Sequence, residues 1–301
     1  MKIGVIVPQG WVLEYVGWDS QAAWARSRDV AWQAEALGFE SIWLYDHFHT
    51  TPQSREEITF EAFTTLAALA AETRRVRLGH VVLCAGYRNP ALTAKMISTL
   101  DVISGGRAEL GIGAGWKRDE WEAYGYGFPP ARERLQMLED QLQILRAMMG
   151  PGRATQRGRR HSVDGAINVP KPLQQPRVPI MVGGNGPNVT WRLAARYADE
   201  LNLDGLSPAE VAKALPTIRQ RCEEIERDPA TLAVSVHVWQ SDLAEQGAAR
   251  SDLVNAYREL GVSRVIGLLR ASVDSDEALA AWADDARQGG AELAESHALG
   301  S

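Results

Sequence analysis

Cysteine is scarce in this chain, and long apolar runs are missing. The two cysteines, Cys84 and Cys222, lie far apart among 301 residues, which excludes a disulfide framework and a cysteine zinc knuckle. No apolar run is long enough to span a bilayer. The first eight residues contain one lysine and end in Pro8, so they do not resemble a secretion signal. We therefore expect a reduced, cytoplasmic protein without a membrane segment.

Basic residues are also fewer than acidic residues. The chain has 32 Lys and Arg against 38 Asp and Glu, a net charge of −6 at pH 7. This balance argues against a nucleic acid or an anionic membrane as partner. The hydrophobic content of 45% is that of an ordinary globular protein. Because 301 residues suffice for one large α/β domain, we expect residues 1–301 to form a single domain.

Strand-like apolar runs alternate with amphipathic stretches along the whole length. The predicted strands lie near residues 2–7, 41–45, 76–83, 107–112, 179–183, 200–204, 232–239 and 263–269. The predicted helices lie near residues 20–37, 60–73, 91–103, 131–149, 187–198, 208–227, 248–260 and 275–297. Because strand precedes helix eight times, this order predicts an α/β protein, a parallel (β/α)8 TIM barrel.

One segment departs from this alternation. Residues 150–178 begin with Gly150-Pro151-Gly152 and are rich in proline towards their end, and they are too long for a simple connection. We predict an insertion after the fourth helix, with a short hairpin, lying over one end of the barrel. Insertions of this kind often serve as lids or interface elements.

His47 is the first candidate for chemistry. It follows the predicted second strand in the segment Tyr45-Asp46-His47-Phe48, and barrel enzymes place their chemistry at the carboxyl ends of strands. Imidazole exchanges a proton near neutral pH. Two alternatives stay open: His47 could only cap its strand, or it could form a metal pair with His49. A metal site needs further ligands from other strand ends, and Asp204 alone is too few, so we predict none.

Two glycine-containing segments follow later strands. Residues 110–116 (LGIGAGW) end the fourth strand, and alternate glycines let a flat ligand or a phosphate approach the main chain. Residues 179–190 run from a buried strand into a helix N-terminus, where free N–H groups and the helix dipole favour a phosphate. The second segment contains Gly183, Gly184, Asn185 and Gly186. A tight turn would use the same glycines.

Aromatic residues gather directly after the first of these segments. Trp116, Trp121, Tyr124 and Tyr126 lie within eleven residues of one another. Such a cluster at the mouth of a barrel either packs the structure or forms the wall of a pocket for a planar or apolar substrate.

Four motifs in this order resemble the bacterial luciferase-like monooxygenase superfamily, and most closely its deazaflavin-dependent branch. They are Asp46-His47-Phe48, residues 110–116, residues 168–176 (NVPKPLQQP) and residues 182–186 (VGGNG). The resemblance covers nearly the whole chain. It implies a (β/α)8 barrel with an insertion and a flavin-type coenzyme in the mouth at the carboxyl ends of the strands. In the deazaflavin branch this coenzyme is F420, and homodimers are common.

The resemblance also implies roles for individual residues. His47 matches the proton-transfer histidine, and Asp46 lies beside it against the deazaflavin ring. Val81 and Val82 match a bulge in the third strand, where a non-proline cis peptide bond backs the ring. The remaining positions implied in cofactor binding are Cys84, Ala114, Gly115, Gly183, Gly184, Asn185 and Gly186. Trp116 is a departure, because sugar-phosphate dehydrogenases of this branch carry a catalytic glutamate there.

The implied function is that of an F420-dependent oxidoreductase. It would transfer a hydride between the deazaflavin and a small, partly apolar substrate, with His47 donating or accepting the matching proton. Trp11, Trp116 and Trp121 would form the walls of the substrate space. An FMN-dependent monooxygenase of the same superfamily is the nearest alternative, because FMN also presents a tricyclic ring and a phosphate. The sequence also leaves open a metal-dependent barrel hydrolase and a binding protein without turnover.

Overall fold

The strands form a closed parallel ring in the computed structural model, which describes residues 1–295. The ring consists, in order, of β1 (Lys2–Ile6), β2 (Ser41–Leu44), β3 (Arg77–His80), β5 (Ala108–Gly113), β8 (Ile180–Gly183), β9 (Glu200–Asp204), β10 (Ala233–Val238) and β11 (Arg264–Gly267). Each strand pairs in parallel with the next, and β11 closes the ring on β1. The predicted (β/α)8 barrel is therefore confirmed.

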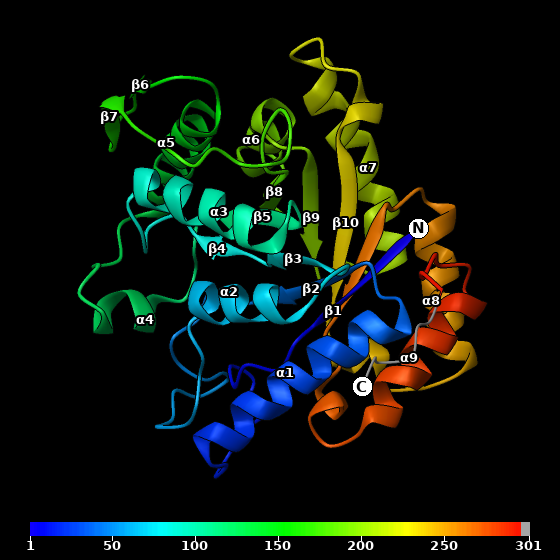
Figure 1. The fold of residues 1–301 in the computed structure, drawn as a ribbon. Coiled ribbons are helices and arrows are strands. Elements are labelled where there is room, and N and C mark those ends of the chain that lie inside the picture. The colour runs from blue at the N-terminus through cyan, green and yellow to red at the C-terminus, as the bar shows by residue number, and fades with distance from the viewer. Residues whose placement is uncertain (296–301) are drawn as a thin grey trace.

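Helices surround this barrel, as Figure 1 shows. They are α1 (Ser20–Leu37), α2 (Ala62–Glu72), α3 (Pro90–Ser104), α5 (Ala131–Met149), α6 (Thr190–Tyr197), α7 (Pro208–Glu223), α8 (Ala248–Glu259) and α9 (Asp276–Gln288). A further short helix, α4 (Arg118–Ala123), lies between β5 and α5 and was not predicted. No helix of the described residues is both long and apolar enough to cross a membrane.

Capping residues explain several of the helix boundaries. The Asp19 side chain accepts hydrogen bonds from the first turn of α1, and Gly38 ends that helix at φ 88°. Asn89 and Pro90 open α3 in the same way. The prediction for the last helix was too long, since α9 ends before Gly289. The chain then turns back, so that Glu292 pairs with the N-terminus. Positions 296–297 of the predicted helix lie outside the described residues.

The third strand position is divided in two. β3 ends at His80, the chain bulges at Val81 and Val82, and β4 (Leu83–Cys84) then pairs with the carboxyl half of β5. The single strand predicted near 76–83 is therefore two short ones.

The insertion lies away from the carboxyl ends of the strands. Its antiparallel strands β6 (Ala154–Arg157) and β7 (Ser162–Ala166) confirm the predicted hairpin, which is held to α5 by Asp140 accepting three backbone N–H groups. Farther on, Gln174 bonds to Arg77 and Ala108, the first residues of β3 and β5. The insertion thus borders the amino end of the barrel.

The amino end of the barrel interior is held by a buried ionic cluster. Arg264 is buried and bonds to Glu109, Glu200 and Glu40. Above it the Trp43 indole fills the interior, where a Cβ at Gly4 or Gly79 would lie within 2.6 Å of indole atoms. The amino end is therefore filled with side chains, and open space is left at the carboxyl end.

Candidate functional site

A cavity of about 290 Å³ lies at the carboxyl ends of the barrel strands. Its walls come from the segments that follow most of the strands. The lining residues are Trp11, Tyr45, Asp46, His47, Val81, Val82, Leu83, Cys84, Tyr87, Gly113, Ala114, Gly115, Trp116, Lys117, Gly183, Gly184, Thr190, Asn202, Asp204, His237 and Trp239. Most of the residues singled out from the sequence therefore meet in one cavity.

His47 is held on two sides. Its Nδ1 lies 2.9 Å from Glu120 Oε2, and its ring stacks on the Trp11 indole at a centroid distance of 4.1 Å and an interplanar angle of 5°. The side chain is 13% exposed. Because Nδ1 is engaged, Nε2 is the ring atom left for a bound molecule.

Glu120, on α4, is the buried carboxylate behind His47. Besides the imidazole, its oxygens accept the N–H groups of Phe48 and His49 and the hydroxyl of Tyr87. Burial raises the pKa of Glu120, but the hydrogen bond and charge of His47 and the two backbone N–H groups outweigh burial and lower it. A charged carboxylate therefore fixes the ring orientation of His47. This residue was not found from the sequence, because the short helix that carries it has no clear pattern.

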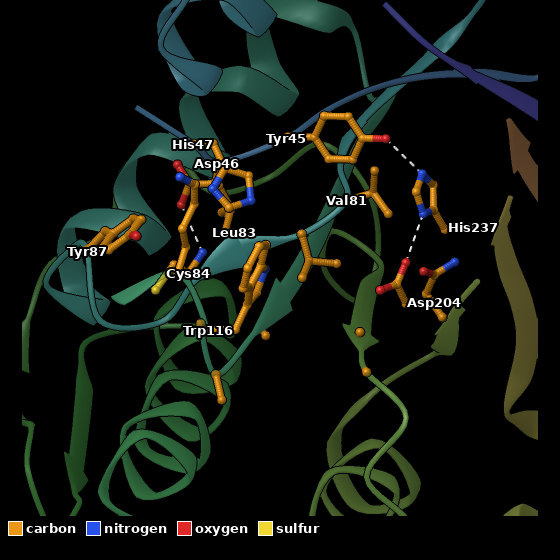
Figure 2. A pocket seen from close by; sticks show the side chains of 18 of the residues that line it. Tyr45, Asp46, His47, Val81, Leu83, Cys84, Tyr87, Trp116, Asp204 and His237 are labelled. Carbon is orange, nitrogen blue, oxygen red and sulfur yellow. Dashed lines mark hydrogen bonds and ion pairs between the residues drawn. The ribbon is translucent and has the colours of Figure 1, made fainter. Parts of the chain in front are cut away.

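Asp46 points to the other side of the second strand end. Its carboxylate accepts the Cys84 N–H at 2.8 Å and both Nη groups of Arg88, at 2.7 and 2.8 Å. Arg88 also pairs with Glu61. Both oxygens of Asp46 are thus engaged by protein groups. Figure 2 shows the bond from the Cys84 N–H. The carboxylate connects the end of β2 to β4. Protonation of Asp46 would weaken the hydrogen bonds that it accepts from Cys84 and Arg88.

The bulge in the third strand forms one wall of the cavity. The Val81–Val82 peptide bond is cis, as the resemblance implied. The Val82 side chain lies against two glycines, since a Cβ at Gly113 or Gly183 would come within 2.9 Å of it. These glycines allow the close approach of β5, β8 and the bulge.

The second glycine segment lies at another edge of the cavity. The N–H of Gly184 already bonds to Asn202 O, and Asn185 bonds through its side chain to the backbone of Asp204. Gly183, Gly184 and Thr190 line the cavity, whereas Asn185 and Gly186 do not. The N-terminus of α6 has no side-chain cap. The Trp191 N–H donates to Gly186 O, so among the described residues the N–H groups of Thr190 and Arg192 are the ones left for an anion.

A second polar group faces His47 across the cavity (Figure 2). The Tyr45 hydroxyl lies 2.8 Å from His237 Nε2, and His237 Nδ1 lies 3.0 Å from Asp204 Oδ1. The Trp239 indole N–H also donates to Asp204 Oδ1. The sequence offered one signal for this group, the spacing His237-x-Trp239 at the end of a strand, but its partners lie on two other strands.

The three predicted tryptophans are not equivalent. Trp11 and Trp116 line the cavity, and Trp116 is 64% exposed. Trp121 is 1% exposed and packs with Cys84 and Tyr87 behind the wall. It therefore does not face the substrate space for which it was predicted.

No group of three or more metal-ligating side chains occurs within residues 1–295. His47 Nδ1 is occupied by Glu120, and His49 Nδ1 lies 4.0 Å from Asp119 Oδ2. The arrangement in the described residues therefore gives no support to the metal-pair hypothesis.

Comparison with known proteins places the chain in a family. The luciferase-like monooxygenase profile matches residues 3–300, so the chain belongs to this family. The resemblance seen in the sequence is thereby confirmed.

Curated relatives agree with the deazaflavin branch. An F420-dependent glucose-6-phosphate dehydrogenase of Kineococcus radiotolerans is 36% identical over 188 residues, which are 62% of this chain and 54% of that protein. An uncharacterized protein of Mycobacterium tuberculosis is 32% identical over 181 residues, 55% of this chain and 63% of the relative. The match thus spans between about half and two thirds of these relatives. An F420-dependent glucose-6-phosphate dehydrogenase of Intrasporangium calvum is 30% identical over 250 residues, 74% of this chain and 73% of that protein.

Solved structures show the same fold. An F420-dependent secondary alcohol dehydrogenase in complex with an F420–acetone adduct has a TM-score of 0.77 and 18% identity, covering 93% of this chain and 98% of that one. A monooxygenase from Streptomyces bottropensis has a TM-score of 0.74 at the same identity and coverage. The names of these two proteins describe different reactions, but their TM-scores to this chain are nearly equal. The fold alone therefore does not show which cofactor is bound.

Proposed function

We propose that this protein is a coenzyme F420-dependent oxidoreductase acting on a small, partly apolar organic molecule. One observation carries the proposal: His47, the Val81–Val82 bulge and the uncapped N-terminus of α6 border a single cavity. The names of the relatives that are 30–36% identical support F420 over FMN.

The cavity fits a flat, phosphate-bearing coenzyme. The walls beside Val82 are made by Gly113, Ala114, Gly115, Gly183 and Gly184, which place no long side chain in the way of a ring. The hydroxyl and the N–H group of Thr190, at the start of α6, would hold a phosphate. When bound, the deazaflavin supplies the hydride donor or acceptor.

The protein would supply the proton. Glu120 and Trp11 hold the His47 ring in place and leave Nε2 for the bound molecule. A positioned imidazole raises the rate of such proton transfers about 10²–10⁴-fold. Asp46 would hold the end of β2 in place and would not transfer a proton, since its carboxylate already accepts hydrogen bonds from Arg88 and the Cys84 N–H. We therefore assign proton transfer to His47 and positioning to Asp46.

The substrate would lie between indoles. Trp11 and Trp116 line both the cavity and an adjoining outer groove of about 650 Å³, in which Trp239 forms a further wall. These surfaces favour a molecule with an apolar body. Because Trp116 replaces the glutamate of the sugar-phosphate dehydrogenases, we propose a substrate other than a sugar phosphate.

We further propose that the chain acts as a homodimer, as the resemblance implies. Exposed apolar side chains on α3 and in the insertion are candidates for the interface. They are Leu92, Val102, Ile103, Ile167, Val169 and Leu173. Light scattering on a sizing column would report twice the chain mass; a monomer at micromolar concentration would refute this part.

Anaerobic titration of the purified chain with F420 and with FMN tests the cofactor assignment. We expect micromolar or tighter binding of F420 and at least roughly tenfold weaker binding of FMN, a difference of about 1.4 kcal/mol. Tight binding of FMN with oxygen uptake, and none of F420, would favour the monooxygenase instead.

A further inference from the structure

The Tyr45–His237–Asp204 group is not used by the proposed proton transfer, although it lines the same cavity. Tyr45 is buried, and burial, followed by the charges of Glu14 and Asp204, raises its pKa well above 10. The phenol therefore stays protonated, and with the His237 proton on Nδ1 it donates a hydrogen bond to His237 Nε2. His237 in turn donates from Nδ1 to Asp204 Oδ1. One tautomer of a neutral imidazole satisfies both bonds.

Every hydrogen-bonding atom of Asp204 except Oδ2 has a partner in the protein. Its backbone N–H and C=O are both bound by the Asn185 side chain, at 3.0 and 2.8 Å. Its Oδ1 accepts from His237 and from Trp239 Nε1, at 3.0 and 3.1 Å. In the described residues Oδ2 has no hydrogen-bond partner, and the side chain is 55% exposed. A preorganised carboxylate oxygen therefore faces open space.

Asp204 lies where the cavity meets the outer groove. Asp204 lines both the cavity and the outer groove, as do Trp11, Trp116 and Trp239. The carboxylate thus stands among indole rings at the passage between the proposed coenzyme site and the exterior.

The charge of Asp204 is not neutralised by a neighbouring lysine or arginine. In the same cavity Asp46 is paired with Arg88, and Lys117 is paired with Asp119. Within residues 1–295 the only ion-pair partner of Asp204 inside 4.0 Å is His237. Arg270 lines the outer groove but donates to Leu13 O.

We propose that Asp204 is a specificity-determining residue that binds a hydrogen-bond-donating group, a hydroxyl or an ammonium, on a substrate whose apolar body lies among Trp11, Trp116 and Trp239. The inference rests on the proposed function, because the molecule so held is the one presented to the coenzyme. His237 and Tyr45 are positioning residues that keep Oδ1 occupied and direct Oδ2 outward.

Binding of three probes of matched shape tests this assignment. Benzyl alcohol, benzylamine (an ammonium at neutral pH) and toluene are titrated by calorimetry into the full chain, with and without F420. We expect the alcohol or the amine to bind at least about tenfold more tightly than toluene, the scale of one charge-assisted hydrogen bond. The two donor probes distinguish a hydroxyl from an ammonium as the preferred group.

Asp204→Asn is the informative variant, because its amide oxygen can still accept from His237 and Trp239. We expect it to reduce the preference over toluene at least fivefold, roughly the loss of one ionic acceptor, with toluene and F420 affinities within about twofold of wild type. The control is Asp242→Asn, which should match wild type. Asp242 is exposed, follows Trp239 by three residues and lines neither space.

Three results would overturn the inference: equal binding of all probes to wild type, an unchanged preference in Asp204→Asn, or weakened F420 binding in that variant with probe binding intact. The last would assign Asp204 to the coenzyme. Failure of the proposed function is separate, since it would appear as absent F420 binding to wild type, whatever the probes do. Circular dichroism on each variant verifies folding.

Discussion

His47 Nδ1 lies 2.9 Å from Glu120 Oε2, so a residue on the short helix α4 orients the side chain at the end of β2. The two residues are 73 positions apart in the chain. Glu120 also binds the N–H groups of Phe48 and His49, so it fixes the backbone of this segment as well as the ring.

Replacing His47 with alanine should reduce turnover by about two orders of magnitude or more, because the proton-transfer group is lost. F420 affinity should stay within about twofold of wild type. F420 reduction with a panel of small alcohols, and its reverse with the matching carbonyl compounds, would measure the change. His49→Ala is the control, since His49 does not line the cavity. Equal turnover of His47→Ala and wild type would contradict the assigned role.

Replacing Glu120 with glutamine should lower kcat on the order of ten- to a hundredfold, less than the loss of His47 itself. The amide keeps one acceptor but removes the charge that binds the imidazole and two N–H groups. KM and F420 affinity should change little, and this split separates a positioning effect from unfolding. Tyr87→Phe removes another donor to Glu120 without touching His47 and should retain most activity. A glutamine variant with normal kcat would exclude the positioning role.

Acid should destabilise the fold through carboxylates whose pKa is lowered. Glu35 Oε2 accepts the N–H groups of Arg74, Arg75 and Val76; burial raises its pKa, but these bonds outweigh burial and lower it below 4.5. Its contribution is therefore complete above the unfolded-state value and is lost as pH falls through the lower folded-state value. Urea unfolding between about pH 6 and pH 3 should show this decline. Glu35→Gln should be less stable at pH 6 and show a flatter slope; an unchanged slope would disprove the assignment.

The barrel and its element order could be predicted because apolar strands and amphipathic helices alternate eight times. The ends marked by Asp19, Gly38, Asn89 and Pro90 were also predictable, since their capping chemistry is local. The last helix was predicted too long because the pairing of Glu292 with the N-terminal strand is not local.

The candidate site was only partly predictable for the same reason. His47 and the glycines follow strands directly, so their common location at the carboxyl end could be inferred. Glu120, Arg88 and the His237–Asp204 pair could not, since each acts through a partner distant in sequence. Trp121 was misplaced because an aromatic pattern does not show which ring turns inward.

Replacing Arg264 with methionine should destabilise the protein by about 3–5 kcal/mol, because Glu109, Glu200 and Glu40 would be left as buried carboxylates without their common partner. Glu200→Gln should destabilise the protein less. Burial raises the pKa of Glu200 and so already favours its protonated, neutral form. Urea unfolding at neutral pH compares the two. A glutamine variant as unstable as the methionine variant would argue against this view of the cluster.

Replacing Gly184 with alanine should weaken F420 binding roughly tenfold, since a residue at φ 129° costs about 1–3 kcal/mol and shifts the segment beside Thr190. Gly105→Ala is the control: it also has positive φ, 69°, but ends α3 away from the cavity. Both variants should lose stability, and only Gly184→Ala should lose affinity. Equal F420 affinities in the two variants would remove residues 183–190 from the proposed site.

The most direct measurement is a crystal structure of the chain with F420 bound. We predict the deazaflavin ring against Val81 and Val82, within hydrogen-bonding or van der Waals reach of His47 Nε2, with its phosphate at Gly184 and Thr190. A coenzyme bound outside this cavity, or a ring that His47 cannot reach, would contradict the proposed function.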